Sequence, residues 1–311
     1  MKRVSLEIPS KRLYNIPILF KAGRNMKIPY IAGEWRVLFK PEKTGNYIND
    51  HTLFKAHDGN YHLFGITSFE SGAPNERYFA HGITKDLSIP MTEQRKEIDR
   101  GTLAWAPCVV RTEGDYYYMF YGPSPTSLAV SFDLYEWYNH TVFLNNEPLF
   151  SAHRDHFVLK LDDGSYIMYI VGTKDKRSCI SLFSSTDLIH WDFKGYALTS
   201  GDDSQLNPPW GAMESPYVVR IDDEYYLFVT YTDCSGENYN NTLVFVSKDP
   251  TSFGVYNGGN GGAIPITQIS AHAPEIIKDG DEYFITTCGW NGYDIPHKGA
   301  VSIAPLKWKS I

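Results

Sequence analysis

The amino-acid sequence predicts an all-β fold, a five-bladed β-propeller, on three observations. A hairpin pattern recurs five times along the chain of 311 residues. No segment keeps apolar residues at the spacing of a helix over a useful length. Aromatic residues make up 15% of the chain, and such residues favour strands. An all-β sandwich is the competing fold, but it does not require five copies of one pattern.

Each copy contains a polar or proline-containing entry, a short β-rich run, a basic residue, a turn and a tyrosine-rich run. The turns, such as HDGN and DDGS, are typical of β-hairpins. The aligned basic residues are spaced 56, 49, 60 and 58 positions apart, and they are Lys55, Arg111, Lys160, Arg220 and Lys278. This period indicates a repeat architecture in which each copy forms one blade.

A third apolar run follows each hairpin and supplies the next strand of the blade, with a variable fourth strand outside it. These runs are residues 76–87, 127–137, 179–191, 242–253 and 299–308. Trp137, Trp191 and Trp308 recur at the ends of such runs and are assigned to blade packing. The propeller is expected to span residues 46–311 as the catalytic domain. Residues 1–45 do not fit the repeat, and ring closure, completion of the last blade and subunit contact all remain open for them.

Composition narrows the class of ligand. The net charge is −7 and no long basic run occurs, which argues against nucleic-acid binding. No apolar run has the length of a membrane span or a signal-peptide core. The expected location is therefore cytoplasmic if the sequence is complete, and periplasmic or secreted if a signal peptide was trimmed. The four cysteines are far apart and are interpreted as small hydrophobic residues.

The strand entries differ between blades. They are NDH at 49–51, WAP at 105–107, RDH at 154–156, ESP at 214–216 and HAP at 272–274. The first strand of each blade lines the central channel, so these entries converge at one mouth. Blades one, three and four place carboxylates there, namely Asp50, Asp155 and Glu214.

A turn-forming role alone does not explain this trio. Glu214 is a poor turn residue, and two other blades show that Ala-Pro suffices at the entry. Three acids that share one aromatic cavity repel one another and are partly desolvated, which raises the pKa of at least one. Hydrolysis of a glycosidic bond needs one carboxylic acid that is protonated and one carboxylate that is ionised. The trio is therefore the predicted catalytic site.

On these residues the chain resembles the five-bladed propeller glycosidases, glycoside hydrolase family 43 and its relatives in families 32, 62 and 68. The likeness covers about residues 45–308. It implies a base or nucleophile at Asp50 (IND), a supporting acid at Asp155 (RDHF) and a general acid at Glu214 (MESP). No cofactor is required by the resemblance, although His272 resembles a blade-five histidine that helps to organise a central calcium or sodium ion in many family 43 members. Hydrogen bonding to a substrate hydroxyl or a carboxylate is an equal alternative for His272.

The resemblance departs from both families in detail. Family 43 usually has Asp-Pro at the first entry, where this chain has Asp50-His51. The same motifs echo family 32 fructosidases, in which the Asp attacks as a nucleophile. The fuller fructosidase motifs Asn-Asp-Pro-Asn-Gly and Glu-Cys-Pro are absent, and so is a C-terminal sandwich domain. These motifs therefore favour the family 43-like class, with family 32 as the alternative.

Further residues near the entries are candidates for substrate binding. Aromatic side chains cover the C–H faces of sugars, and polar ones bind hydroxyls. Arg154 is also able to hold a neighbouring carboxylate ionised. The candidates are Asn49, His51, Trp105, Arg154, Trp210, His272 and Trp290. For each tryptophan, packing is as good an explanation as sugar contact.

The expected function is hydrolysis of a plant-type or microbial oligosaccharide or polysaccharide, with release of arabinose, xylose or a related sugar. Glu214 lies six positions before its aligned basic residue and Asp50 lies five. This offset and the family 43 resemblance predict an inverting mechanism, with the two carboxyl groups roughly 6.5–9.5 Å apart. A retaining fructosidase-like enzyme and a glycan-binding propeller without catalysis are the alternatives. The exact sugar, the linkage and the oligomeric state do not follow from the sequence.

Overall fold

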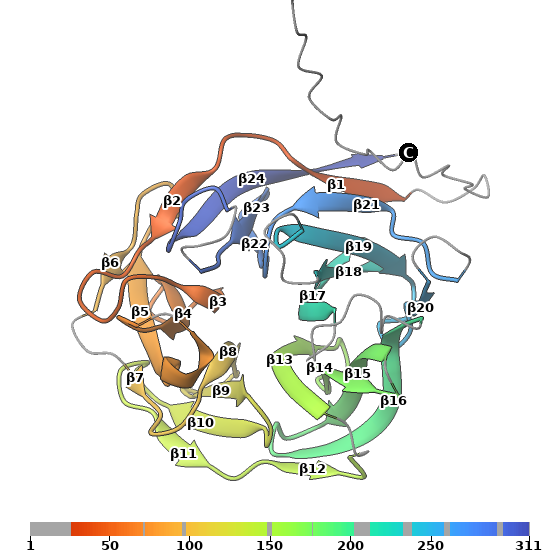
Figure 1. Cartoon of the computed structure of the whole chain (residues 1–311), viewed down its shortest axis with the longest axis horizontal. Coiled ribbons are helices and arrows are strands. Elements are labelled where there is room, and N and C mark those ends of the chain that lie inside the picture. Colours follow the sequence, from red (N-terminus) through yellow and green to blue (C-terminus); the bar gives the residue numbers. More distant parts are fainter. Residues whose placement is uncertain are drawn as a thin grey trace, which may run out of the picture.

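The computed structural model describes residues 26–70, 72–94, 98–147, 151–175, 177–201, 212–232, 238–257, 262–290 and 295–310. These residues form five sheets, antiparallel except for two short outer strands of the third, arranged as a ring around a central channel, as Figure 1 shows. The single helical element within them is the 3₁₀ turn η1 (Ala73–Asn75). No helix in these ranges is long and apolar enough to cross a membrane. The predicted five-bladed β-propeller is confirmed.

Blades one and two are built from consecutive strands of the chain. Blade one has the order β3-β4-β5-β6, and β7 also pairs with β5. Its strands are β3 (Asn49–Lys55), β4 (Tyr61–Thr67), β5 (Tyr78–Thr84), β6 (Thr92–Glu93) and β7 (Ile98–Asp99). Blade two consists of β8 (Trp105–Arg111), β9 (Tyr117–Gly122), β10 (Ser127–Ser131) and β11 (Tyr138–His140).

Blades three and four follow the same plan with additions at the outer edge of blade three. Blade three consists of β13 (Ser151–Lys160), β14 (Tyr166–Lys174), β15 (Arg177–Ser185) and β16 (His190–Ser200). Two short strands, β12 (Phe143–Asn145) and β20 (Gly254–Tyr256), run parallel to β16. Blade four consists of β17 (Met213–Ile221), β18 (Glu224–Tyr231), β19 (Asn241–Ser247) and β21 (Thr267–Ser270).

Blade five combines strands from both ends of the chain. Its inner strands are β22 (Ile276–Asp279), β23 (Glu282–Thr287) and β24 (Val301–Ser310). The outer strands β1 (Lys27–Ile31) and β2 (Arg36–Phe39) both pair antiparallel with β24. Residues 1–25 lie outside the described part of the chain, whereas residues 27–39 add strands to the last blade. This pairing joins the two ends of the propeller.

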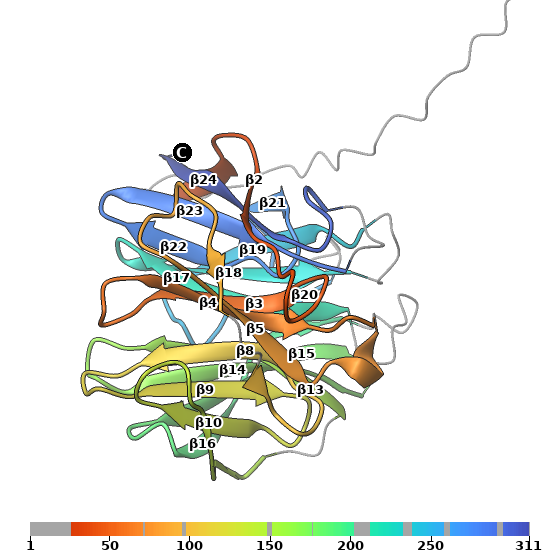
Figure 2. The same cartoon turned by 90° about the vertical axis from the view of Figure 1, so that its left-hand side faces the viewer.

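Apolar cores fill the spaces between neighbouring blades. Two of these clusters combine residues of blades one and two and of blades three and four, through side chains such as Phe79, Met119, Tyr169 and Leu227. Figure 2 shows the ring from the side, with β3 and β8 running along the channel axis. The first strand of each blade therefore presents its side chains to the channel.

A belt of contacts joins the inner strands in the channel. Most of its side chains bond to the backbone of the next blade. Thr52 accepts from Val109 N at 3.3 Å, the Cys108 thiol from Val158 N, and Glu275 from Leu53 N, while Tyr217 donates to Ile276 O at 2.8 Å. Between blades three and four, the rings of Phe157 and Tyr217 pack with centroids 4.5 Å apart. We call these five side chains, Thr52, Cys108, Phe157, Tyr217 and Glu275, the channel belt.

Candidate active site

Each inner strand enters the channel through a residue with left-handed backbone. These residues are Asp50, Ala106, Asp155, Ser215 and Ala273, with φ of 41°, 45°, 55°, 49° and 45°. Such φ values are uncommon outside glycine. In blades one to four the strand register also shifts at this point, as in a β-bulge. A bulge redirects a side chain, so the same local distortion turns all five residues toward the channel.

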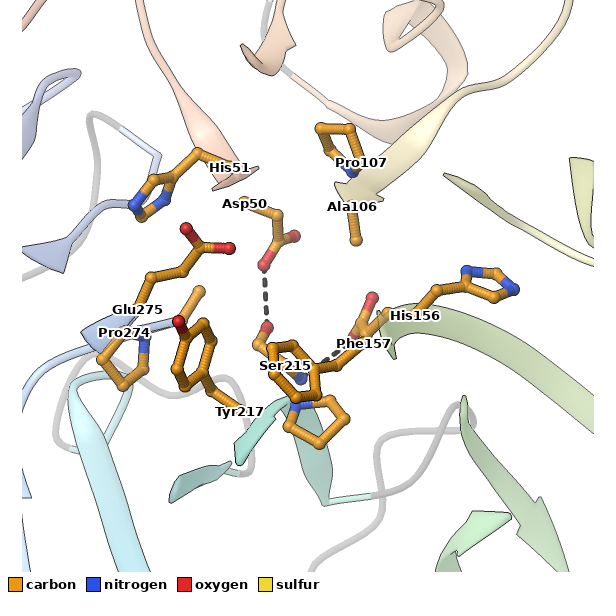
Figure 3. A pocket seen from close by; sticks show the side chains of 13 residues that line it. Asp50, His51, Ala106, Pro107, His156, Phe157, Ser215, Tyr217, Pro274 and Glu275 are labelled. Atoms are coloured by element: carbon orange, nitrogen blue, oxygen red, sulfur yellow. Dashed lines mark hydrogen bonds between the residues drawn. The ribbon is translucent and has the colours of Figure 1, made fainter. Parts of the chain in front are cut away.

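A pocket in the central channel is lined by all five blades (Figure 3). Its lining combines two carboxylic acids at the left-handed positions with alanine, serine and proline from the other entries. The lining residues are Asp50, His51, Ala106, Pro107, Asp155, His156, Phe157, Ser215, Pro216, Tyr217, Ala273, Pro274 and Glu275. The sequence-predicted convergence of the blade entries is therefore present in the structure.

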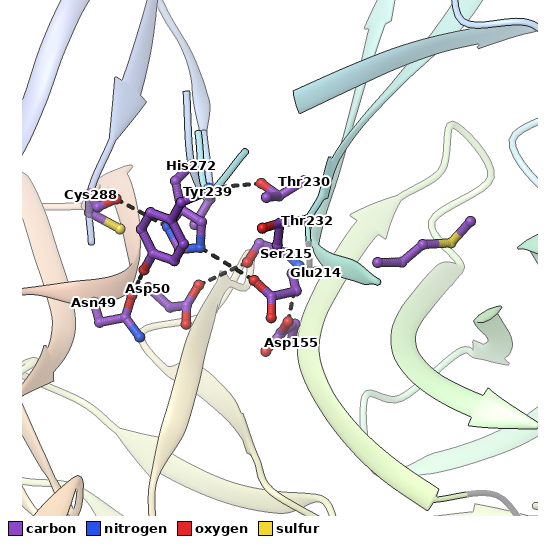
Figure 4. Close-up of polar contacts among 12 residues, drawn as sticks. Asn49, Asp50, Asp155, Glu214, Ser215, Thr230, Thr232, Tyr239, His272 and Cys288 are labelled. Atoms are coloured by element: carbon purple, nitrogen blue, oxygen red, sulfur yellow. Dashed lines mark hydrogen bonds and ion pairs between the residues drawn. The ribbon is translucent and has the colours of Figure 1, made fainter. Parts of the chain in front are cut away.

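Ser215 connects the two aspartates. Its hydroxyl donates to Asp50 Oδ1 at 2.8 Å, and its backbone N–H donates to Asp155 Oδ2 at 3.0 Å (Figures 3 and 4). Ser215 occupies in blade four the position that the aspartates occupy in blades one and three. The carboxyl groups of blades one and three therefore meet at one residue of blade four.

Glu214 precedes Ser215, so its carboxylate approaches the site from a different position of the strand. Its Oε1 lies 3.2 Å from Arg154 Nη2. Its Oε2 lies 3.4 Å from His272 Nε2, as Figure 4 shows. Arg154 Nε also lies 3.4 Å from Asp155 Oδ2. The buried guanidinium thus sits between two acids, and the imidazole contacts the far side of Glu214.

The two aspartates favour their protonated forms. Burial, followed by repulsion from Asp155, raises the pKa of Asp50 to about 7. Burial also raises the pKa of Asp155, although Arg154 acts in the opposite direction. The Ser215 hydroxyl is among the groups that lower the pKa of Asp50. Asp50 therefore ionises near neutral pH, where a base or a nucleophile is useful.

Glu214 shows the opposite behaviour. Burial alone would raise its pKa, but the His272 hydrogen bond and the Arg154 charge hold the pKa of Glu214 below its usual value. Burial alone would lower the pKa of His272, but Glu214 and Asp50 raise it. A proton shared by Glu214 and His272 thus resides on the imidazole in the free protein. The sequence analysis expected it on Glu214, and the neighbouring cations explain the difference.

Comparison with protein families identifies the chain. A family model described as the glycosyl hydrolases family 32 N-terminal domain matches residues 39–258. The match covers more than half of the chain and includes Asp50, Asp155 and Glu214. The chain belongs to this family. It is therefore a glycoside hydrolase, although the matched model is that of family 32 rather than the family 43-like class that the sequence analysis favoured. No curated protein matches the chain.

Solved structures resemble this family 32 protein at low sequence identity. A thermostable family-43 glycoside hydrolase has a TM-score of 0.60 and 20% identity, over 88% of this chain and 92% of that one. An α-L-arabinanase of Cellvibrio cellulosa complexed with arabinohexaose has a TM-score of 0.59 and 14% identity, over 86% and 92%. The GH32 β-fructofuranosidase BmSUC1 of Bombyx mori has a TM-score of 0.56 and 14% identity, over 91% and 62%. These similarities show the shared propeller fold.

The residues that the sequence predicted to bind substrate in this family 32 chain make different kinds of contact in the structure. Asn49 is buried and accepts a hydrogen bond from Tyr239. His51 contacts Thr286 Oγ1 at 2.8 Å and Cys288 Sγ at 3.3 Å, so both ring nitrogens face protein atoms. Trp105 packs against the core between blades one and two. His51 also lines the pocket, and substrate contact by His51 and Trp105 stays a prediction.

Trp290 lies near the site because its ring stacks with Tyr239, which in turn stacks with His272. Its indole N–H donates to Glu76 Oε1 at 2.8 Å, and its ring stacks with Tyr239 at 6.3 Å between centroids. The side chain is half-buried. Trp210 lies outside the described residues.

The structure also bears on the possible central cation. Within the described residues, no group of three or more His, Cys, Asp or Glu side chains is arranged to hold a metal ion. His272 Nδ1 lies 3.0 Å from the carbonyl oxygen of Cys288, and Nε2 faces Glu214. Both nitrogens of this imidazole therefore contact protein atoms. The cation stays a prediction.

Two residues of the site were not found from the sequence. Ser215 was noted only as part of the ESP entry, although its distance from Arg220 equals the distance of Asp50 from Lys55. That equal spacing was the signal that could have identified it. Tyr239 lies in the connection between β18 and β19, outside the repeated pattern, and nothing in the sequence marks it.

Proposed function

We propose that this family 32 glycoside hydrolase cleaves its substrate by double displacement with retention of configuration. Asp50 is the nucleophile, Glu214 is the acid and base, and Asp155 is the supporting acid. The observation that carries the proposal is the family match, which spans all three acids that converge around Ser215. Family 32 members are the relatives in which the first aspartate attacks the sugar.

In the first step, Asp50 attacks the anomeric carbon. Its Oδ1 is held by Ser215, so we assign the attack to Oδ2. The bond between the anomeric carbon and the leaving oxygen breaks as Glu214 protonates that oxygen. Glu214 receives this proton from His272 across their 3.4 Å contact. The products are a glycosyl ester on Asp50, a free alcohol and a neutral imidazole.

In the second step, water replaces the ester. Glu214, now ionised, removes a proton from water as the oxygen attacks the anomeric carbon. The ester bond breaks, Asp50 leaves as a carboxylate, and the sugar is released with its original configuration. The proton on Glu214 returns to His272, which restores the starting arrangement. Arg154 holds Asp155 and Glu214 in place during both steps.

The proposed substrate is a glycan or sucrose-type sugar with a terminal fructofuranosyl unit. Support comes from the family match and from the similarity to a Bombyx mori β-fructofuranosidase. The half-buried Trp290 ring, which stacks with Tyr239, is an apolar face of the kind that packs against the C–H face of a sugar.

A second candidate is inverting hydrolysis of arabinose- or xylose-type glycans, in which Asp50 activates water. The similarity in length and fold to an α-L-arabinanase favours it, since the alignment covers 92% of that chain. This candidate requires the wider separation of the carboxyl groups, roughly 6.5–9.5 Å, rather than about 5–5.5 Å.

The test is a screen of sucrose, fructo-oligosaccharides, arabino-oligosaccharides, xylo-oligosaccharides and aryl glycosides, followed by product analysis in water with methanol. A methyl glycoside with the substrate's configuration supports double displacement, whereas an inverted sugar with no methyl glycoside supports the second candidate. Glu214→Gln should lower kcat about 10²–10⁴-fold on unactivated substrates. Asp115→Asn, on an exposed turn, is the matched control and should leave kcat unchanged. Glycan binding without turnover would overturn both candidates.

A further inference from the structure

Tyr239 contacts both sides of the proposed catalytic site. Its ring stacks on the imidazole of His272, with centroids 3.9 Å apart and planes at 14° (Figure 4). Its hydroxyl donates to Asn49 Oδ1 at 3.1 Å. His272 contacts Glu214, and Asn49 directly precedes Asp50. One buried side chain thus touches a neighbour of the acid and a neighbour of the nucleophile.

The backbone of blade five is shaped to admit this ring. Gly289 has a φ of 155°, and a Cβ atom there would lie 2.6 Å from Cε1 of Tyr239. Any other residue at position 289 would therefore displace the ring. Tyr239 also stacks with the indole of Trp290, with centroids 6.3 Å apart, and Glu76 anchors that indole through its N–H. The Tyr239 ring therefore packs against His272, Trp290 and the backbone of Gly289.

The Tyr239 ring restricts the orientation of the His272 imidazole. A flat neighbour at this distance fixes the plane of the imidazole. The carbonyl oxygen of Cys288, 3.0 Å from Nδ1, fixes the rotation of the imidazole within that plane. With both constraints, Nε2 points to Glu214 Oε2. Without the ring, the imidazole is free to tilt away, and the 3.4 Å contact with Glu214 is lost.

We propose that Tyr239 is a positioning residue with two functions: its ring directs His272 to the acid Glu214, and its hydroxyl fixes Asn49 beside the nucleophile Asp50. The inference rests on the proposed roles of Glu214 and Asp50. It predicts that loss of the ring weakens protonation of the leaving group, whereas loss of the hydroxyl alone does not.

Two classes of substrate separate these functions. An alkoxide leaving group requires protonation by Glu214, whereas a nitrophenolate leaves without it. Tyr239→Met fills the space without an aromatic plane, and it should lower kcat/KM, which reports the first step, on the unactivated glycoside about tenfold more than on the nitrophenyl glycoside of the same sugar. Tyr239→Phe keeps the ring, so the ratio of the two kcat/KM values should remain that of the wild type. Asn240→Ala, in the same connection but bonded to Ser270, is the control and should change neither value.

The outcomes distinguish this inference from the proposed function. Equal losses on both substrates in Tyr239→Met overturn the role of the ring. A Tyr239→Phe variant that reproduces the ratio of Tyr239→Met also overturns it, and this variant preserves the packing if the methionine variant does not fold. Absence of turnover by the wild-type protein on every glycoside overturns the proposed function itself.

Discussion

The hydroxyl of Ser215 donates a hydrogen bond to Oδ1 of Asp50 at 2.8 Å, although 165 positions separate the two residues in the sequence. Asp50 is buried beside Asp155, so its ionised form has few other sources of stabilisation. A hydrogen bond to a charged group contributes about 1.5–3 kcal/mol. Ser215 is therefore well placed to set the pH at which Asp50 becomes reactive.

Ser215→Ala should move the acidic limb of kcat/KM to higher pH. Asp50 must be ionised to act, and its pKa is about 7, so activity falls as the pH drops through that value. Loss of the donor raises the pKa of Asp50 further, by about one unit. Ser215→Cys, with a weaker donor, should lie between the two. A pH profile in which Ser215→Ala keeps the wild-type acidic limb would contradict this role.

Arg154→Met should lower the free energy of unfolding, because it removes a buried cation that contacts two acids of the site. The guanidinium is buried between Asp155 and Glu214, and it also donates to the carbonyl oxygens of Ala152 and Met213. Removal of one partner from a buried ion pair costs about 3–5 kcal/mol. Urea denaturation measures this loss. Arg111→Met, at an exposed position on β8, is the control, and an equally small effect for both variants would argue against a buried ion cluster.

Acid should destabilise the protein through buried neutral histidines. Burial lowers the pKa of His156 to about 3. The unfolded chain binds a proton below about 6.5 that the folded chain does not, so stability is lost as the pH falls from about 6.5 toward 3. At pH 4.5 the loss from one such histidine is about 2–3 kcal/mol.

His156→Gln should therefore reduce the difference in unfolding free energy between pH 7 and pH 4.5. Glutamine retains a polar group for Thr126, whose hydroxyl lies 2.8 Å from His156 Nε2. His140→Gln, on the exposed strand β11, is the control. If both variants keep the wild-type pH dependence, the acid sensitivity has another origin.

Glu275→Gln should leave stability nearly unchanged, whereas Glu275→Leu should not. Burial raises the pKa of Glu275 well above its usual value, so the side chain is neutral when it accepts the hydrogen bond from Leu53 N. The glutamine carbonyl accepts the same bond, but leucine leaves a buried N–H without a partner, at a cost of about 1–3 kcal/mol. Calorimetric unfolding measures both variants, and a glutamine variant as unstable as the leucine variant would show that the charge matters.

The repeat allowed the fold to be predicted from the sequence. The aligned basic residues located all five inner strands, and the strands found in the structure begin within a few residues of the predicted entries. Apolar residues follow the entries of these strands in short continuous runs, such as CVV at 108–110 and FVL at 157–159, because both faces of the strands are largely buried between blades. The edges were less predictable. The strands β1 and β2 come from a segment without repeat pattern, and their place depends on pairing with β24 at the far end of the chain.

The candidate site was predictable only where the repeat reached it. Asp50 and Asp155 occupy equivalent left-handed positions, so counting from Lys55 and Lys160 located them together. The electrostatic state of Glu214 depends on Arg154 from blade three and His272 from blade five, and no local pattern encodes that meeting. Tyr239 was missed for the same reason, since its contacts with Asn49 and His272 join three blades.

The side chains of the channel belt differ from blade to blade, so the contacts between neighbouring blades depend on the order of the blades. All five junctions differ in chemistry: hydroxyl with amide, thiol with amide, ring with ring, phenol with carbonyl, and carboxyl with amide. Each blade therefore contacts the next one through a side chain that no other junction uses in the same way. A sixth blade made by duplication, or two blades exchanged in the gene, would keep every sheet intact and still leave buried groups without partners in the channel. The contacts inside the channel therefore favour one order of the blades around the ring, even though the blades share one sequence pattern.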